Sequence, residues 1–477
     1  MAITRRRFLT RSGLFAAGSV LAPSLFAHPL VRSAFAETVG DRYFVSLYLD
    51  GGNDGQNTVA PIADGSSFGL RAAYEAARRT GGGGLRLSAS ELLGTPSGGP
   101  PLVDASSGTP IGLHPGLAGL HRLYGQGKVA VIQGCGYPDY SLSHEEARAA
   151  WETGQPGVAT LPGGWLGRYL AANYGGAEIP GVNVRSSLAG EFRQSTTSIL
   201  TVDNVRDFGF PYDPSFGSDR DEKRNAFLAL CEDAAASAQG TLAHVGTSAR
   251  ATLLSSESYP ALHDVYVADR ASFDSAYGAL GTSLAGDLRE MAKVIYGVVT
   301  GQPNVTARFF QAVNGGYDTH SDQGAGEPDG QHSRLHRELG EAIEVFYQDC
   351  EDMGVADKVV TVVWSEFARR IEQNGSGTDH GSQGPMFVIG GGVNGGVYGN
   401  HPNIADADLE DDGNTRYRQT AHPFRSTDFR DVFGTILKHW LNMSQPQILS
   451  NILIPDPAAG EYWNLTNGIN LDMGFLP

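Results

Sequence analysis

The chain has 477 residues, of which 41% are hydrophobic and 18% are charged, and its formal net charge is -17. A chain of this length and apolar content can bury a large core, either as one α/β domain or as two or three domains. The acidic balance argues against nucleic acid and against an anionic membrane surface as partners. The three cysteines lack a Cys-x-x-Cys spacing, which excludes zinc-finger sites and haem attachment. We expect all three to be buried as small apolar side chains.

The first residues have the pattern of a twin-arginine export signal. Arg5-Arg6-Arg7-Phe8-Leu9 precedes a modest apolar run over 13–27 and a small-residue site at Ala34-Phe35-Ala36. The run is too short, and too rich in Gly, Ser and Pro, for a stable membrane anchor. We therefore predict a signal peptide over 1–36, cleaved after Ala36 by way of the twin-arginine export machinery, and a periplasmic or secreted mature protein. A disordered basic tail is the alternative.

Strand and helix patterns alternate along the mature chain. Apolar and β-branched runs predict strands at 42–49, 128–133, 181–184, 308–313, 359–364 and 386–389. Helical patterns cover 116–126, 163–170, 284–299, 331–352 and 427–441. An Ala-rich helical pattern with breaks near 256–260 fills 219–299, which we expect to form a helical insert. This order predicts one α/β domain over 37–477, with a mostly parallel central sheet flanked by helices.

The densest polar stretch follows the strand that begins at 308. Asp318, His320 and Asp322 alternate after Gly315-Gly316, and in an extended segment this spacing places all three side chains on one side. Two carboxylates and an imidazole can hold a divalent cation. A polar turn whose aspartates bond the backbone is the plainer interpretation. We expect Asp318 and His320 to be metal ligands and Asp322 to lie behind them.

Further polar residues follow the other strands. Asp50 ends the first strand, Glu366 follows the strand at 359–364, and Asp379 and His380 lie in the next polar loop. Because the carboxyl ends of parallel strands share one edge of a sheet, we expect these groups to meet Asp318 there. Carboxylates with imidazoles suit Zn, Mn or Fe, whereas carboxylates alone suit Mg or Ca.

Ser143 lies just past a strand, at the predicted start of a helix. Glu146 follows three positions later, as in a capping box, which would make Ser143 an N-cap with a structural role. A hydroxyl at a helix N-terminus is also well placed to attack an anionic centre, because the backbone N–H groups and the helix dipole favour negative charge there. The two roles are compatible, and both stay open.

Seven short motifs lie at residues 5–9, 49–58, 142–144, 163–168, 315–320, 365–369 and 378–381. Together they resemble the exported bacterial proteins of domain-of-unknown-function family 1501. That family is similar to the alkaline phosphatase–sulfatase superfamily, whose members bind two divalent metals around a Ser, Thr or formylglycine nucleophile on an α/β sheet. The resemblance implies an alkaline phosphatase-like α/β fold and a site architecture, but it implies no substrate.

Position by position, the resemblance also implies roles for single residues. Asp50 corresponds to a metal-binding aspartate on the first strand, and Ser143 corresponds to the nucleophile. Asp318 and His320 correspond to an aspartate–histidine metal pair, at a spacing shorter than the usual Asp-x-x-x-His of the superfamily.

A later strand of the superfamily normally ends in an Asp-His pair, and here the chain departs from that pattern. The strand ends in Ser365-Glu366, and Asp379-His380 come thirteen residues after Glu366. Either Glu366 replaces the aspartate and His380 is the last histidine, or Asp379 and His380 form the pair. The order of the strands favours the first mapping. Both carboxylates remain candidate metal ligands.

These observations predict a metal-dependent hydrolase of phosphate or sulfate esters. About two divalent ions (Zn, Mn, Mg or Ca) would lower the pKa of the Ser143 hydroxyl or of a water and neutralise the leaving oxygen. Arg168 or Arg369 would bind the oxygens of the transferred group, and the substrate would be an anionic small-molecule or polysaccharide ester. The alternative is a non-catalytic exported binding or assembly protein, perhaps related to polysaccharide, on a degenerate phosphatase-like scaffold.

Other chemistries lack their motifs. The chain has no Walker loop and no His-Glu-x-x-His. A formylglycine needs Cys/Ser-x-Pro-x-Arg, which neither Cys135 nor Ser143 begins. His332 and His336 are spaced i, i+4 on a predicted helix and are a possible metal pair, though such histidines more often lie on a surface or behind a site. We expect structural roles for the four remaining histidines that we considered: His114, His144, His401 and His422.

Overall fold

The computed structural model describes residues 41–65, 69–157, 163–174, 179–184, 187–194, 196, 198–209, 219–404, 425–454 and 469–477. The predicted signal peptide over 1–36, its cleavage site and His422 lie outside these residues. No helix of the described ranges is long and apolar enough to cross a membrane.

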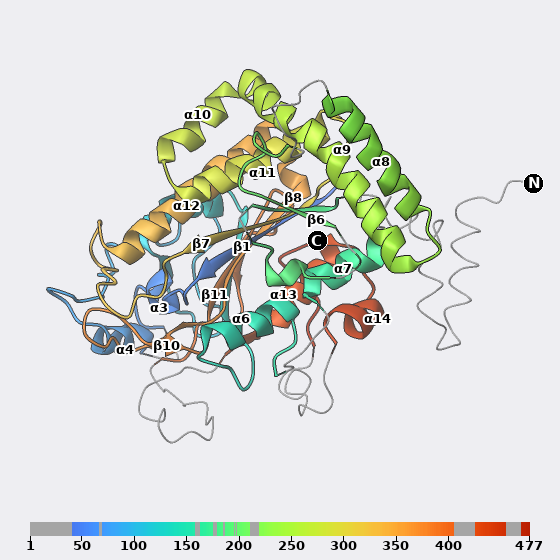
Figure 1. The fold of residues 1–477 in the computed structure, drawn as a ribbon. Helices are drawn as coiled ribbons and strands as arrows, with labels where there is room; N and C mark the ends of the chain where they lie inside the picture. The colour runs from blue at the N-terminus through green and yellow to red at the C-terminus, as the bar shows by residue number, and fades with distance from the viewer. Residues whose placement is uncertain are drawn as a thin grey trace, which may run out of the picture.

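A mostly parallel sheet forms the centre of the described chain (Figure 1). Its nine strands run in the order β12-β4-β11-β8-β1-β7-β5-β6, with β13 paired to β4. β11 is antiparallel to both of its neighbours, and every other pairing in this sheet is parallel. The strands are β1 (Tyr43–Asp50), β4 (Val129–Gly136), β5 (Gly181–Val184), β6 (Ile199–Val202), β7 (Phe309–Gly315), β8 (Val359–Ser365), β11 (Gly384–Ile389), β12 (Gly396–Tyr398) and β13 (Thr427–Asp428). The predicted α/β class is confirmed.

Helices cover both faces of this sheet. One face packs against α5 (Ala118–Gly125), α11 (Ser283–Val299) and α12 (Gln331–Asp352), and the other against α6 (His144–Thr153), α7 (Trp165–Asn173) and α13 (Phe429–Thr435). The central strand β1 is apolar almost throughout because both of its faces are buried. Val45 and Leu47 pack into the hydrophobic core on one face of the sheet, and Phe44 and Tyr48 pack into the core on the other face. A parallel strand buried on both faces requires such a run.

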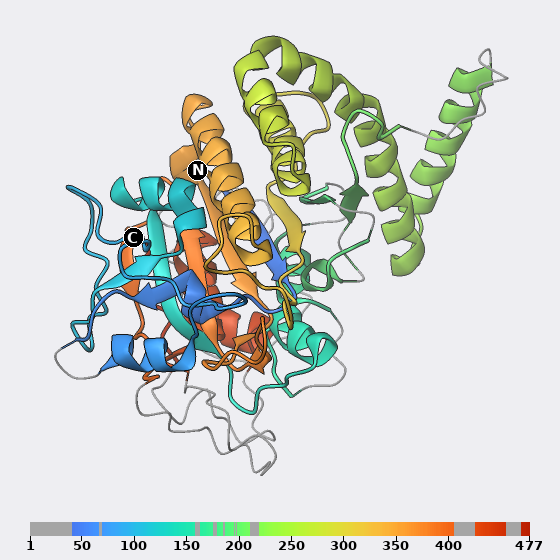
Figure 2. The same cartoon turned by 90° about the vertical axis from the view of Figure 1, so that its left-hand side faces the viewer.

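Four helices occupy the residues expected to form a helical insert: α8 (Arg220–Ala235), α9 (Gly240–Asp269), α10 (Ala271–Leu280) and α11. The predicted break near 256–260 is wrong, because α9 continues through Pro260. The flanking Tyr259 and Leu262 are buried in the core, and this packing outweighs the hydrogen bond that a proline removes. Figure 2 shows α8 and α9 projecting from the body as a helical pair.

Smaller elements complete the described chain. The stretch 65–112 contains α4 (Leu70–Ala77), whose first N–H groups are capped by the Asp64 carboxylate. The cysteines are free and buried, as predicted. The remaining elements are α3 (Gly55–Thr58), β2 (Val59–Pro61), β3 (Ile111–Leu113), η1 (Pro115–Leu117), η2 (Gly190–Phe192), η4 (Ala356–Lys358), β9 (Ala368–Arg369), β10 (His380–Gly381), η5 (Ile436–Trp440), α14 (Gln445–Gln447) and η6 (Ile448–Ile452).

Candidate metal centre

The candidate site lies at the carboxyl edge of the sheet, where the loops after β1, β7 and β8 meet. The Tyr317 N–H donates to the Asp50 carbonyl at 3.1 Å and holds the loop after β7 against the end of β1. Gly51 has a φ of +118°, and a Cβ there would collide with the backbone nitrogen of Asp318. Glycine therefore permits both the turn and the close approach of the two loops. This approach brings Asp318 to the centre of the site.

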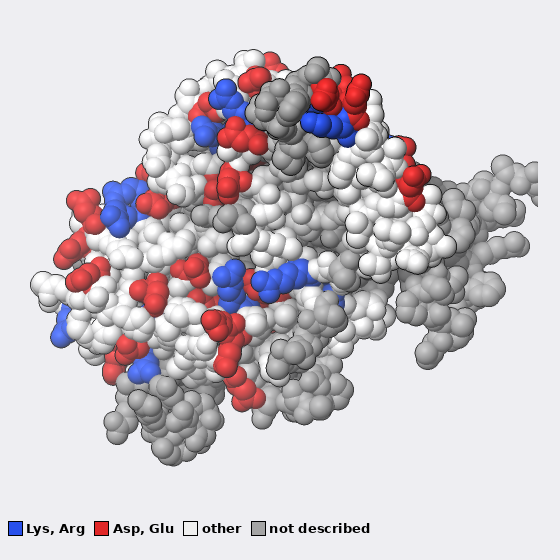
Figure 3. Space-filling model, in the orientation of Figure 1, with Lys and Arg blue, Asp and Glu red and all other residues white. Residues whose placement is uncertain are grey.

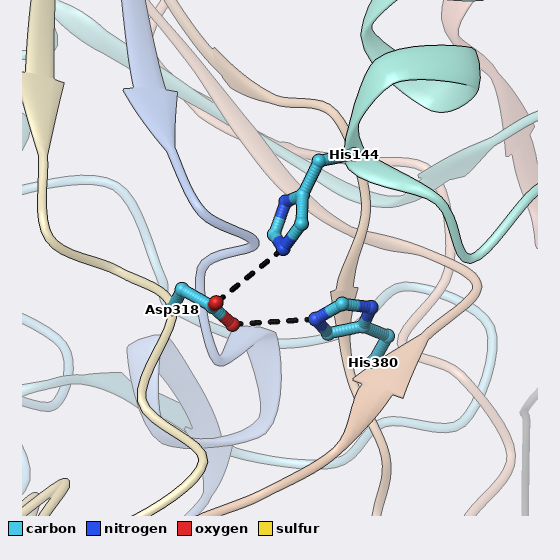
Figure 4. Close-up of side chains that lie close together, drawn as sticks. All are labelled: His144, Asp318 and His380. Carbon is cyan, nitrogen blue, oxygen red and sulfur yellow. Dashed lines mark hydrogen bonds and ion pairs between the residues drawn. The ribbon is translucent and has the colours of Figure 1, made fainter.

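Three imidazoles converge on the Asp318 carboxylate, and Figure 4 draws two of them, those of His144 and His380. His380 Nε2 lies 3.2 Å from Asp318 Oδ1, and His144 Nε2 lies 3.5 Å from Oδ2. His320 Nε2 lies 3.2 Å from the same Oδ1 and 3.0 Å from His380 Nε2. One ligating atom from each of His144, Asp318 and His380 lies within 4.8 Å of the others. Asp318, His320 and His380 are brought together as the sequence predicts, whereas His144 joins them unexpectedly.

The second ring nitrogen of each imidazole has its own hydrogen-bond acceptor. Each Nδ1 donates to an oxygen that can only accept: His380 to the Leu142 carbonyl at 2.7 Å, His144 to Glu366 Oε1 at 2.8 Å, and His320 to Asp379 Oδ1 at 3.2 Å. In a neutral ring the proton therefore sits on Nδ1, and Nε2 keeps a lone pair. Three lone pairs then face a carboxylate and one another. A cation placed among them would relieve this repulsion.

Glu366, predicted as a metal ligand, instead lies behind His144. Its side chain is fully buried, and Oε1 accepts the Gly51 N–H at 3.0 Å as well as the imidazole. Oε2 accepts the Ser365 hydroxyl at 3.1 Å. The hydrogen bond from Glu366 raises the pKa of His144 against the opposing effect of burial. Glu366 therefore orients a ligand and does not itself face the cluster.

Asp379 and Asp322 also turn away from the centre. Asp379 Oδ1 accepts from Asn374 Nδ2 at 3.0 Å and from His320, so this predicted ligand orients the His320 ring. Asp322 has a φ of +52°, and its backbone N–H and Oδ1 both bond Ser376. The extended geometry expected for the alternating triplet therefore fails at Asp322, because the chain turns into the left-handed region there.

Arg369 fixes the central carboxylate. Its guanidinium is fully buried, and Nη2 donates to Asp318 Oδ1 at 2.6 Å. Burial alone would raise the pKa of Asp318, but the hydrogen bond and charge of Arg369 outweigh it and lower the pKa to about 2. The other guanidinium contacts are backbone carbonyls of Gly51, Gly52, Tyr317 and Thr378. Arg369 thus holds these loops together, with each of its three guanidinium nitrogens bonded to the protein.

Arg168, the other candidate for substrate binding, lies on α7 and is engaged elsewhere. Its guanidinium donates to the backbone carbonyls of Thr153, Gly163 and Ile452. Burial lowers its pKa to about 10. These contacts join α6, α7 and η6 and indicate a structural role for Arg168, whose catalytic role stays a prediction.

Asp50 ends β1 as predicted, but its carboxylate points along its own strand. Asp50 Oδ1 accepts the Tyr48 hydroxyl at 2.9 Å. Asp50 therefore lies at the predicted edge of the sheet, but its carboxylate contacts Tyr48 and not the predicted metal cluster. The backbone after Asp50 contributes through Gly51, which binds Glu366.

Ser143 is the N-cap residue of α6, as predicted, and its side chain is exposed. The predicted capping box is absent: Glu146 accepts from the Ser141 hydroxyl at 2.7 Å, and Ser143 contributes no side-chain capping bond. Its neighbours on both sides touch the cluster, because the Leu142 carbonyl binds His380 and His144 faces Asp318. In the part of the chain that the structure describes, the Ser143 hydroxyl makes no capping bond to α6, and Ser143 directly precedes His144 of the candidate metal cluster.

His144 is the site residue that sequence reasoning missed. A lone histidine in the first turn of a helix is usually structural, and its partners come from β8 and from the loop after β7, more than 170 residues away. One signal was present: His144 belongs to the motif at 142–144. From that motif we predicted a functional role for Ser143 and only a structural role for His144.

The donor set fits a divalent transition metal. Imidazole nitrogens with a carboxylate are typical ligands of Zn²⁺ and suit Mn and Fe, whereas Mg²⁺ and Ca²⁺ prefer oxygen shells. The side chains of His144, His320 and Asp318 are 37%, 46% and 47% exposed, so an ion here would keep one side open to solvent. An open coordination position is the mark of a catalytic site, since structural sites are closed.

A second group of histidines lies in the core behind this site. His114, His332 and His336 are fully buried, with ring centroids 4.0 to 5.4 Å apart. His332 Nε2 contacts Asn53 Oδ1 at 3.2 Å, and His336 Nε2 contacts Thr58 Oγ1 at 2.9 Å. These contacts hold the loop after β1 against α12. The histidine pair at i, i+4 therefore supports the site from within the core.

Comparisons with known proteins give a family and two distant structural likenesses. The model of the family described as "Protein of unknown function (DUF1501)" matches residues 123–422. A crystal structure of Ps i-CgsB in complex with k-i-k-neocarrahexaose is similar at a TM-score of 0.36 and 9% identity, over 87% of this chain and 75% of that one. The PsFucS1 sulfatase from Pseudoalteromonas sp. is similar at a TM-score of 0.30 and 11% identity, over 83% and 73% of the two chains. No curated protein matches. Likenesses this distant assign no activity.

Proposed function

The chain belongs to the DUF1501 family of proteins of unknown function, and we propose from its site alone that it is a metal-dependent hydrolase of phosphate or sulfate esters. One observation carries the proposal: the bare Nε2 atoms of His144, His320 and His380 converge on the Asp318 carboxylate. Each ring is held by an acceptor on its other nitrogen, which is how proteins orient imidazole ligands before a metal binds.

A divalent ion held by these side chains would supply Lewis-acid stabilisation of the charge that develops on a phosphoryl or sulfuryl group. The residues of the chain have three tasks around it. Asp318 and the imidazoles hold the ion, Arg369 keeps Asp318 ionised, and the exposed Ser143 hydroxyl is the candidate nucleophile. The N-terminus of α6, with its unpaired N–H groups, favours the negative charge of an ester approaching Ser143.

The substrate class in this proposal is an anionic ester, either a small molecule or a polysaccharide. The face drawn in Figure 3 carries basic residues in small groups among acidic ones and shows no broad basic field. We propose that the protein acts after twin-arginine export, in the periplasm or outside the cell, and this assignment comes from the sequence of residues 1–36 alone.

A second candidate function has one observation in its favour. Arg168 and Arg369, the two guanidinium groups expected to bind the anionic group, are both engaged by backbone carbonyls. A non-catalytic exported protein that binds polysaccharide through a metal would need no such clamp. The absence of turnover, together with specific glycan retention, would favour this function.

The test is a screen of aryl phosphates and aryl sulfates with added Zn²⁺, Mn²⁺, Mg²⁺ or Ca²⁺. The proposed hydrolase turns over at least one ester class, loses activity in Asp318→Ala together with bound metal, and loses activity in Ser143→Ala with the metal retained. Turnover that persists in both variants, or a protein that binds no divalent ion, contradicts the proposal.

A further inference from the structure

A small, partly open cavity lies beside the segment that follows His380. Its lining includes Gln56 of α3, Gln133 of β4 and Gln383, which directly precedes β11. The volume open to the centre of a water-sized sphere is about 10 Å³, which is room for one small occupant. The cavity is separate from the metal-ligating cluster, since none of its lining residues belongs to that cluster.

The three glutamines that line the cavity are buried, and some of their side-chain amide atoms have no hydrogen-bond partner. They are 2% or 3% exposed, and Gln56 Oε1, Gln133 Oε1 and both amide atoms of Gln383 have no partner. Leaving a buried polar atom unpaired destabilises the folded protein. Unpaired groups from three separate elements around one cavity indicate that an occupant bonds them in the folded protein.

A buried negative charge stands next to this cavity. Asp104 is fully buried, and its Oδ1 accepts from Gln133 Nε2 at 3.3 Å and from the His401 backbone N–H at 2.9 Å. Its Oδ2 accepts from Ser106 and Ser107. Within the described ranges no lysine or arginine forms an ion pair with Asp104. Among the described residues the Asp104 carboxylate thus has no Lys or Arg partner, which is unusual for a buried charge.

The amide of Gln133 connects the charge to the cavity. Its NH₂ group donates to Asp104, and this contact polarises the amide so that Oε1, the unpaired atom, carries more negative charge. Gln56 and Gln383 supply two further neutral oxygens. Neutral amide oxygens beside one negative charge balance a monovalent cation, whereas Ca²⁺ sites usually place carboxylates in direct contact with the ion.

We propose that this cavity binds one alkali-metal cation, Na⁺ or K⁺, through the amide oxygens of Gln56, Gln133 and Gln383, with Asp104 as the balancing charge. The occupant would tie α3 and β4 to the segment that follows His380 by three residues. The cation therefore has a structural role in holding one wall of the metal centre. The proposal does not depend on the proposed hydrolase activity.

The test measures the melting temperature of the full-length protein in choline chloride, NaCl and KCl at constant ionic strength. We expect Na⁺ or K⁺ to raise the melting temperature by about 2 °C or more relative to choline, with a saturable dependence on concentration. Gln56→Met, which keeps the side-chain volume but removes the amide, abolishes this increase. Gln126→Met, an exposed control, retains it.

Equal melting temperatures in all three salts overturn the proposal, as does a cation effect that persists in Gln56→Met. A variant that fails to fold leaves a second test on the unaltered protein. Crystals grown in Na⁺, K⁺ and Rb⁺ salts are compared at the cavity. Density that changes with the cation, or an anomalous Rb⁺ signal, supports the site. Density of a single water in every salt overturns it.

Discussion

At the scale of single residues, the candidate site divides its work between two kinds of side chain. His144, His320 and His380 present unprotonated nitrogens to Asp318, whereas the carboxylates of Glu366 and Asp379 hold two of the rings from behind. These two carboxylates, which were predicted to bind a metal directly, instead accept hydrogen bonds from the imidazoles of His144 and His320. The distinction is chemical, since an imidazole bonded to a carboxylate is a stronger and better oriented ligand.

The role of Glu366 predicts the effect of replacing it by its amide. Glu366→Gln keeps an oxygen for the Gly51 and His144 N–H groups but removes the charge that raises the pKa of His144. We expect the affinity for Zn²⁺ to fall about 10- to 100-fold, as is usual for partners of metal-bound histidines. Isothermal titration with Zn²⁺ measures the change.

The matched control is Glu145→Gln, an exposed position on the same helix as His144. It should leave the Zn²⁺ affinity within about twofold, because an exposed charge is screened by solvent. Equal losses in both variants would show that the net charge of α6, and not the Glu366–His144 contact, governs the affinity.

Replacing Ser143 by alanine should abolish the proposed activity but leave the stability of the protein nearly unchanged. Replacing a serine N-cap by alanine usually costs about 1 kcal/mol because a capping hydrogen bond is lost. Ser143 makes no such bond and is exposed, so Ser143→Ala should change the free energy of unfolding by less than about 0.5 kcal/mol. Urea unfolding measures this value. A loss of more than about 1 kcal/mol would show that the hydroxyl caps α6 in solution, and would make loss of activity in this variant ambiguous.

At the scale of elements, the helices over the sheet are joined by a buried ion pair. Arg270, between α9 and α10, contacts the fully buried Asp349 of α12 at 2.5 Å, and the Tyr266 hydroxyl donates to the same carboxylate at 2.6 Å. Removing one partner leaves an unpaired buried charge. This contact therefore fastens the helical insert to the helix that supports the metal centre.

The ion pair predicts a large difference between two arginine variants. Arg270→Ala should destabilise the protein by about 3–5 kcal/mol, because Asp349 stays buried without its partner. Arg224→Ala, which removes a more exposed ion pair to Glu257 between α8 and α9, should destabilise the protein far less, because solvent screens this pair. Chemical denaturation of the two variants measures both costs. Similar values would mean that the insert is held to the body by apolar packing alone.

The same scale shows what could be predicted from the sequence. Local patterns located α12 over residues 331–352 and the central strands β1 and β8, because apolar periodicity reports burial directly. The orientation of β11 was not predicted, since strand direction depends on distant pairing. Contacts between residues far apart in the sequence also determine which side chains form the candidate site. The edge positions of Asp318 and His380 followed from strand ends, whereas the place of His144 depended on how α6 packs beside β8.

At the scale of the whole molecule, the buried histidines couple stability to pH. Burial lowers the pKa of His114 to about 4 and of His332 to about 3, and lowers that of His336 well below its usual value of 6.5. The unfolded chain takes up these protons as the pH falls through about 6.5, but the folded protein does not. Their effect on stability is therefore absent well above pH 6.5 and becomes a loss below it.

The three histidines contribute a fall of about 4 kcal/mol in the free energy of unfolding between pH 7.5 and pH 5.5, about 1.4 kcal/mol each. The buried Glu191 contributes in the opposite direction, because burial raises its pKa to about 8 and the folded protein takes up this proton before the unfolded chain does. We therefore expect a net fall that is smaller than the histidine contribution. His144 opposes this trend, because its raised pKa contributes stability at low pH that is lost as the pH rises through the folded value. Urea unfolding at several pH values measures the slope. A free energy of unfolding that rises as the pH falls over this range would show that the three buried imidazoles titrate normally in the folded protein, because Glu191 and His144 alone would give that rise.

The central claim is that Asp318 and the imidazoles around it hold one divalent metal ion, and equilibrium dialysis of the chelator-treated protein against Zn²⁺ and Mn²⁺ tests it most directly. We predict a site that binds about one ion per chain and whose affinity falls more than about 100-fold in Asp318→Ala and in His144→Ala, beyond the loss caused by removing an orienting partner. Binding that is absent, or that is unchanged in both variants, would contradict the account.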